Sequence, residues 1–137
     1  MTKYTVVLDT NVYLSGIIFG GNSGHLLDLA IEGKLTIISS AAILLEISDK
    51  LKNKFHWNKE QIIVTIKSIA KLSEVVTPKK KLQIVKKDKD DNKIIEAAYE
   101  SDSDFIITGD KHLLEIKKYQ NIHIISPSQF LSVYFKK

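Results

Sequence analysis

Short runs of Ile, Val and Leu alternate with helix-like segments along the chain, and this alternation restricts the fold more than any other feature. Strands are expected at residues 4–8, 35–39, 73–76, 104–108 and 122–126. Helices are expected between them, at residues 23–32, from Ser39 or Ser40 to about 54, from Asn58 to about 71, at about 90–101, in a short turn at 113–116, and after Pro127. Nearly continuous apolar strands separated by helices are typical of an α/β protein whose parallel sheet is covered on both faces.

Several residues mark helix ends. Asn58 is followed three residues later by Gln61, which predicts a capping box. Gly33 is placed to end the helix at 23–32, and Pro127 suits the first turn of the closing helix.

The composition predicts one domain, spanning residues 1–137, without disulfides or a membrane span. The chain has no cysteine, which excludes a disulfide framework and a Cys-based zinc site. No apolar run approaches the roughly 18 residues of a membrane span, and the first residues do not form a secretory signal. We therefore expect a cytoplasmic protein. The net charge of +4 modestly favours polyanionic partners such as nucleic acid.

Four acids follow or interrupt the apolar segments in a way that predicts one shared edge. Asp9 and Asp110 each follow an apolar strand, and the carboxyl ends of parallel strands lie at the same edge of the sheet. Asp91 opens the helix at 90–101, and Glu46 interrupts the apolar run "AAILLEISDKL". Clustered carboxylates repel one another, and proteins gather them mainly to bind hard divalent cations, which predicts Mg2+.

Each acid also has a simpler interpretation, and these stay open at this point. Asp9 and Asp110 could be strand-end caps, and Glu46 could be a solvated helix residue. Asp91 could serve only the helix dipole, with Asp88 and Asp90 competing for that position. We favour Asp91 as the ligand over Asp90 because Asp91 lies one turn before the expected buried residues Ile94 and Ile95. The four histidines lack metal-ligand spacing and are expected to be surface or packing residues (His25, His56, His112 and His123).

Four stretches together resemble the PIN-domain ribonuclease family, most closely the toxins of bacterial and archaeal toxin–antitoxin pairs. They are "VVLDTNVYLSGIIFGG", "SSAAILLEISDKL", "DKDDNKIIEAA" and "FIITGDKHLL". The resemblance implies a three-layer α/β/α sandwich that cleaves RNA with Mg2+ or Mn2+, a homodimer and a cognate antitoxin. It places the family's acids on Asp9, Glu46, Asp91 and Asp110, and polar second-shell supports on Asn11 and Thr108. Many relatives carry an acid where His112 stands.

The expected chemistry is metal-dependent hydrolysis of RNA phosphodiester bonds, as in the toxin of a type II toxin–antitoxin system. Asp9 and Asp91 would be the chief ligands, with Asp110 nearby, and Glu46 would position a water or act as the base. The alternative is a catalytically silent module that binds RNA or a protein partner.

Residues outside the four acids also have two interpretations. The stretch 79–93 carries seven lysines, which either follow RNA phosphates or form a solvated loop. Tyr13 and Phe19 either stack bases or pack in the core. A haloacid-dehalogenase-like phosphatase is excluded because its Asp-x-Asp-x-Thr motif is missing at Asp9.

Overall fold

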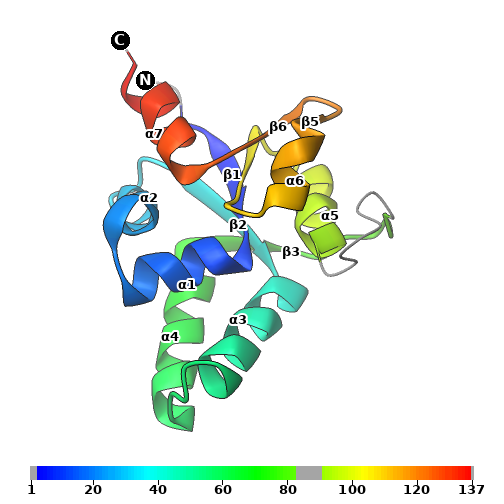
Figure 1. The fold of residues 1–137 in the computed structure, drawn as a ribbon. Coiled ribbons are helices and arrows are strands. Elements are labelled where there is room, and N and C mark those ends of the chain that lie inside the picture. The colour runs from blue at the N-terminus through cyan, green and yellow to red at the C-terminus, as the bar shows by residue number, and fades with distance from the viewer. Residues whose placement is uncertain (1–2, 83–90, 137) are drawn as a thin grey trace.

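The computed structural model describes residues 3–82 and 91–136 and has a six-stranded sheet at its centre (Figure 1). The strands are β1 (Thr5–Leu8), β2 (Thr36–Ser40), β3 (Ser73–Val76), β4 (Phe105–Ile107), β5 (Lys118–Tyr119) and β6 (Ile122–Ile125). Their order across the sheet is β3-β2-β1-β4-β6-β5. All neighbours pair in parallel except β5 and β6. The predicted α/β fold with a mostly parallel sheet is confirmed.

Helices flank this sheet. They are α1 (Thr10–Ile18), α2 (Gly21–Ile31), α3 (Ala41–Asn53), α4 (Lys59–Leu72), α5 (Asn92–Ser101), α6 (Lys111–Ile116) and α7 (Pro127–Phe135). The chain crosses from β1 to β2 in one direction and from β3 to β4 in the other, so right-handed crossovers place α2 and α5 on opposite faces. Helix α7 packs with α2, and its Phe130 contacts the rings of Tyr4 and Phe105 edge-on. No helix in the described ranges has the length and apolar character to cross a bilayer.

The predicted helix ends agree with the structure. Asn58 and Gln61 form the capping box of α4, and Pro127 is the first residue of α7. Of the two serines considered for α3, Ser40 is the cap, because its hydroxyl accepts a hydrogen bond from the Ile43 backbone N–H at 3.3 Å. Gly33 follows the end of α2 with a φ of 75°, a conformation that glycine adopts without strain.

Helix α1 and strand β5 were not predicted from the sequence. The residues of α1, "TNVYLSGII", mix polar and apolar side chains without a clear helical period, so they lack the continuous polar face by which a surface helix is recognised. Strand β5 has only two residues. Helix α2 begins at Gly21, two residues before the predicted start. Helix α5 begins at Asn92, whereas the predicted start at residue 90 lies outside the described residues.

A glycine allows α1 and α2 to pack closely. A Cβ atom added at Gly16 would lie 2.8 Å from Leu27 Cδ1 and 3.0 Å from the backbone C and O of Ser23. The end of the Leu27 side chain can rotate away, but the Ser23 backbone can yield only if α1 and α2 separate by a few tenths of an ångström. The glycine therefore helps to fix α1, which directly follows Asp9.

Candidate functional site

The site lies where the chain reverses its direction across the sheet, between β1 and β4. Ligands of open α/β sheets bind at this point, outside the carboxyl ends of the strands. In strand β1, Val6, Val7 and Leu8 are fully buried, and Asp9 follows them directly. The strand-end residues Asp9 and Thr108 are themselves only 5% and 0% exposed. The carboxylate of Asp9 is thus held inside the edge of the sheet.

Thr108 links the ends of the two strands. The Thr108 hydroxyl donates a hydrogen bond to Asp9 Oδ2 at 2.7 Å. Thr108 Oγ1 also accepts a hydrogen bond from the Asp110 backbone N–H at 2.9 Å. One buried side chain thus orients the Asp9 carboxylate and holds the start of the turn that carries Asp110. This is the kind of contact expected of a second-shell support.

The environment of Asp9 opposes its ionised form. Burial raises the pKa of the carboxyl group, the Thr108 hydroxyl lowers it, and the charge of Asp110 raises it again. The backbone N–H of Asn11 lowers the pKa of Asp9 and the charge of Glu46 raises it, both by smaller amounts. The resulting pKa lies above that of an ordinary aspartate. A cation beside Asp9 would relieve this unfavourable energy, because a positive charge favours the ionised carboxylate.

Asp110 caps helix α6. Its Oδ1 accepts a hydrogen bond from the His112 backbone N–H at 2.7 Å. The cap interpretation considered for this residue is therefore realised in the structure. It is compatible with a second role, because an ionised carboxylate has several acceptor positions and the cap uses one of its two oxygens.

Glu46 comes from α3 and is half-buried, as expected, with a side chain that is 21% exposed. Its Oε1 accepts a hydrogen bond from the Thr10 hydroxyl, and its Oε2 lies 3.0 Å from Lys93 Nζ. Burial would raise the pKa of Glu46. The two hydrogen bonds and the charges of Lys93 and Lys50 outweigh that effect and bring the pKa below its usual value. Glu46 is therefore held as a carboxylate.

Asp91 lies at the start of α5 and is buried, 7% exposed. Its side chain makes no capping hydrogen bond to the helix that it precedes, and the helix-dipole interpretation of Asp91, which needs no such bond, still stands. Two residues later, Lys93 reaches Glu46, so the N-terminal end of α5 faces α3 at this edge. Asp88 and Asp90, the alternatives to Asp91, lie outside the described residues.

The Asn11 side chain does not contact the Asp9 side chain. Asn11 Oδ1 accepts a hydrogen bond from Lys50 Nζ at 3.1 Å on the exposed side of α1. Its influence on Asp9 comes from its backbone N–H, which helps to lower the pKa of that carboxyl group. Of the two predicted supports, only Thr108 touches one of the four acids through its side chain.

The donor chemistry of the site suits a hard divalent cation, although its acids are not arranged as a closed cage. In residues 3–82 and 91–136, no three Asp, Glu or His side chains form a group that could hold a metal ion. The physical reason is that Lys93 and Thr10 engage Glu46, while the cap of α6 engages Asp110. Mg2+ is commonly held by one or two carboxylates and completed by water and substrate phosphates. The arrangement fits such an open site better than a structural metal site.

The structure decides between the two interpretations of Tyr13, and it shows two partners of Glu46 that the sequence did not predict. Tyr13 is fully buried, and burial raises its pKa to about 12, so it belongs to the core and not to a stacking surface. Phe19 is 78% exposed. Thr10 and Lys93 were missed as partners of Glu46. Their only signals in the sequence were the position of Thr10 after Asp9 and the membership of Lys93 in the lysine-rich stretch, of which residues 83–90 lie outside the described part.

Comparisons with known proteins identify the family and support the fold. The family model of the PIN domain matches residues 5–112. Uncharacterized protein MJ1680 of Methanocaldococcus jannaschii is 36% identical over an alignment covering 98% of this chain and 94% of that protein. The crystal structure of VapBC2 from Rickettsia felis, bound to a DNA fragment from their promoter, has a similar fold: TM-score 0.63, 18% identity, 89% of this chain and 98% of that chain. The chain belongs to the PIN domain family.

Proposed function

We propose that the protein is a metal-dependent endoribonuclease that hydrolyses RNA phosphodiester bonds, and that it is the toxin of a type II toxin–antitoxin pair. The observation that carries the proposal is the buried Asp9 carboxylate, held by Thr108 and facing the charges of Asp110 and Glu46. This cluster lies at the ligand-binding edge of a PIN-domain sheet. Its open position suits a polymer substrate better than an enclosed small molecule.

Asp9 and Asp91 would hold Mg2+ or Mn2+, with Asp110 contributing an oxygen. When bound, such a cation activates a water for attack and stabilises charge that develops on the phosphate. Thr108 fixes the orientation of Asp9. Glu46, kept ionised by Thr10 and Lys93, would accept a proton from the attacking water or hold that water in position.

The toxin assignment rests on the resemblance of the four motif stretches to toxin sequences, and the VapBC2 structure of similar fold supports it. It implies a cognate antitoxin and a homodimer. Exposed apolar side chains on α4 and directly after α1 are available for such contacts: Phe19, Ile63 and Val64. Expression of the chain should arrest growth, and co-expression of a neighbouring gene product should relieve the arrest. Light scattering on the purified protein should give twice the monomer mass.

A catalytically silent binding module is the second candidate. The ion pair between Glu46 and Lys93 favours it, because that pair occupies one of the four acids in the absence of substrate. Two measurements on the same preparation separate the candidates. The enzyme should bind Mn2+ in calorimetry and cleave single-stranded RNA, and EDTA should stop the cleavage. A silent module should bind RNA and leave its length unchanged.

A further inference from the structure

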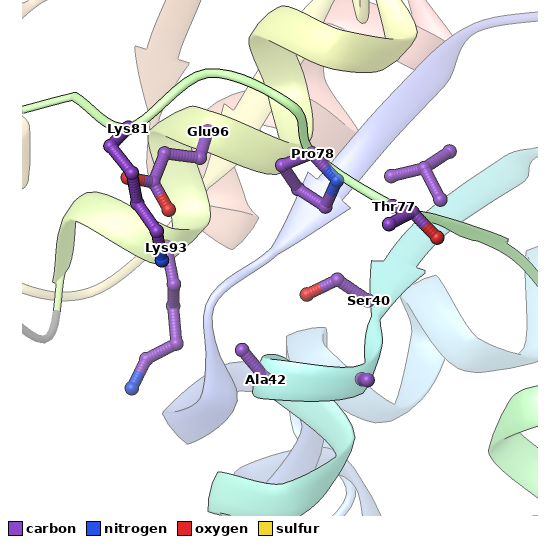
Figure 2. Close-up of a pocket in the computed structure, with 9 residues that line it drawn as sticks. Ser40, Ala42, Thr77, Pro78, Lys81, Lys93 and Glu96 are labelled. Atoms are coloured by element: carbon purple, nitrogen blue, oxygen red, sulfur yellow. The ribbon is translucent and has the colours of Figure 1, made fainter.

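A small pocket lies beside the candidate site, at the carboxyl ends of β2 and β3 (Figure 2). Its volume is about 130 Å³. Ser40 and Ala42 at the start of α3 form one wall, and Pro78 lies across from them. Lys81, Lys93 and Glu96 form the wall on the side of α5. None of the roles assigned to the four acids uses this pocket.

The volume of the pocket restricts what it can hold. Sites for whole small molecules usually measure about 300–1,000 Å³. A space of about 130 Å³ is smaller than this, and it admits one ring-sized group. The occupant is therefore better explained as one unit of a chain whose remaining units lie outside the pocket.

The chemistry of the lining favours a nucleobase over a phosphate. Aliphatic carbon of Ala42 and Pro78 offers an apolar surface to the face of a ring. The Ser40 hydroxyl points into the space between Pro78 and Lys93, where it can bond to a ring edge (Figure 2). Glu96 adds an acceptor for base N–H groups, and its negative charge would repel a phosphate held inside the pocket. The Glu96 carboxylate also accepts a hydrogen bond from the Leu82 backbone N–H at 2.8 Å, which ties the segment after Lys81 to α5.

Lysines connect the pocket to the candidate site. Lys93 lines the pocket, and its Nζ lies 3.0 Å from Glu46 Oε2. Lys93 therefore links the pocket to Glu46, one of the four acids. Lys81 is exposed at the mouth and makes no ion pair with another residue of the described ranges. It is placed to contact the backbone phosphate of a nucleotide whose base lies inside.

We infer that this pocket is an RNA subsite that binds the base of a nucleotide next to the scissile phosphate. The inference rests on the proposed function, because that function places an RNA phosphate at Asp9 and its neighbours. Ala42 and Pro78 contact the face of the base, Ser40 and Glu96 bind its edge, and Lys81 contacts the adjoining phosphate.

Filling the pocket tests the inference. Ala42 is exposed in the first turn of α3, so Ala42→Trp places an indole in the pocket without disturbing the core. Leu45→Trp is the matched control, because it puts the same group on the same helix at a position that is 62% exposed and outside the pocket lining. Binding of a fluorescein-labelled single-stranded RNA of mixed sequence is measured by anisotropy in EDTA, with the RNA length checked afterwards. Ala42→Trp should weaken binding by about tenfold, the order expected for losing one bound base, and Leu45→Trp should not.

Two further measurements identify the occupant. Adenosine and uridine, which have no phosphate, should shift the amide NMR signals of residues 40–42, which line the part of the pocket assigned to the base, whereas inorganic phosphate should not. Lys81→Ala should lower the salt dependence of RNA binding by about one unit of slope, and its neighbour Lys79→Ala, outside the lining, should change it less.

The outcomes separate this inference from the proposed function. Equal RNA binding by wild type and Ala42→Trp, or equal weakening by Ala42→Trp and Leu45→Trp, would overturn the subsite. A response to phosphate without a response to nucleosides would overturn it as a base site. RNA cleavage in Mn2+ is scored separately. Cleavage by wild type with an unaffected Ala42→Trp would leave the function standing and remove the subsite. Selective loss of binding in Ala42→Trp, with no cleavage by wild type, would keep the subsite and remove the nuclease.

Discussion

Replacing Thr108 by valine should destabilise the protein in a way that depends on the charge of Asp9. The substitution keeps the shape of the side chain and removes the hydroxyl that donates to Asp9 Oδ2 and accepts from the Asp110 N–H. A hydrogen bond to an ionised group contributes about 1.5–3 kcal/mol and a neutral one about 1 kcal/mol. Because Thr108 is fully buried, water cannot replace its hydroxyl. We expect the free energy of unfolding to fall by about 2–4 kcal/mol at pH 7.

Urea denaturation measures this loss, and Thr108→Ser is the control. Serine keeps the hydroxyl and loses one methyl group, which costs about 1 kcal/mol. The difference in the free energy of unfolding between Thr108→Val and Thr108→Ser should become smaller at acid pH, because protonation of Asp9 removes the charged acceptor. NMR titration should show a further rise in the pKa of Asp9 in Thr108→Val, since the hydroxyl opposes the effect of burial. If the two variants are equally stable from pH 4 to pH 8, or if the pKa of Asp9 does not change, Thr108 does not support the carboxylate as argued.

The other predictions concern the acids of the site and the packing of α1 on α2. Asp9→Asn should abolish RNA cleavage with an unchanged circular dichroism spectrum, and wild-type rates in excess Mg2+ would contradict its role. Mn2+ should raise the melting temperature of wild type and raise that of Asp9→Asn less, as thermal shift would show; an equal rise in both would place the metal elsewhere. In EDTA, the stability of wild type relative to Asp9→Asn should fall as the pH rises above about 4, because the folded state, with its raised Asp9 pKa, binds more protons than the unfolded state. Relative to Glu46→Gln, wild type should instead lose stability as the pH falls below about 4, because the folded pKa of Glu46 is lowered. If stability changes with pH in the same direction relative to Asp9→Asn and relative to Glu46→Gln, the assignment of these two pKa shifts is wrong. Gly16→Ala should lower the free energy of unfolding by about 1 kcal/mol through the clash with α2. Gly24→Ala, whose added Cβ lies 3.5 Å from its nearest contact, should raise the free energy of unfolding by about the same amount. Urea denaturation that gives both variants the same change in stability would refute the close-packing argument.

The sequence predicted the sheet because its strands are short apolar runs separated by helices. It also placed Asp9 and Asp110 near each other, since the carboxyl ends of neighbouring parallel strands must meet. Helix α1 escaped prediction because its polar and apolar residues do not repeat with a clear helical period. Its absence from the prediction also hid Thr10, whose hydroxyl reaches Glu46 only when α1 packs against α3.

The partners of the acids depend on packing that the sequence does not express. Nothing in the spacing of Glu46 and Lys93, which are 47 residues apart, indicates that they form an ion pair. The cap at Asp110 was equally hidden. The strand-end position of Asp110 predicts a carboxylate at the edge of the sheet, but it does not predict that Oδ1 caps α6. The four acids were expected as one group. In the described residues, threonine, lysine and backbone N–H groups engage three of them: Asp9, Glu46 and Asp110.

The contact between Thr108 and Asp9 joins residues that are 99 positions apart. During synthesis, Thr108 is added 99 residues after Asp9. No partial chain ending before residue 108 can orient the Asp9 carboxylate in this way. An RNA-cleaving site built on this carboxylate would therefore stay incomplete until β4 and Thr108 have been made.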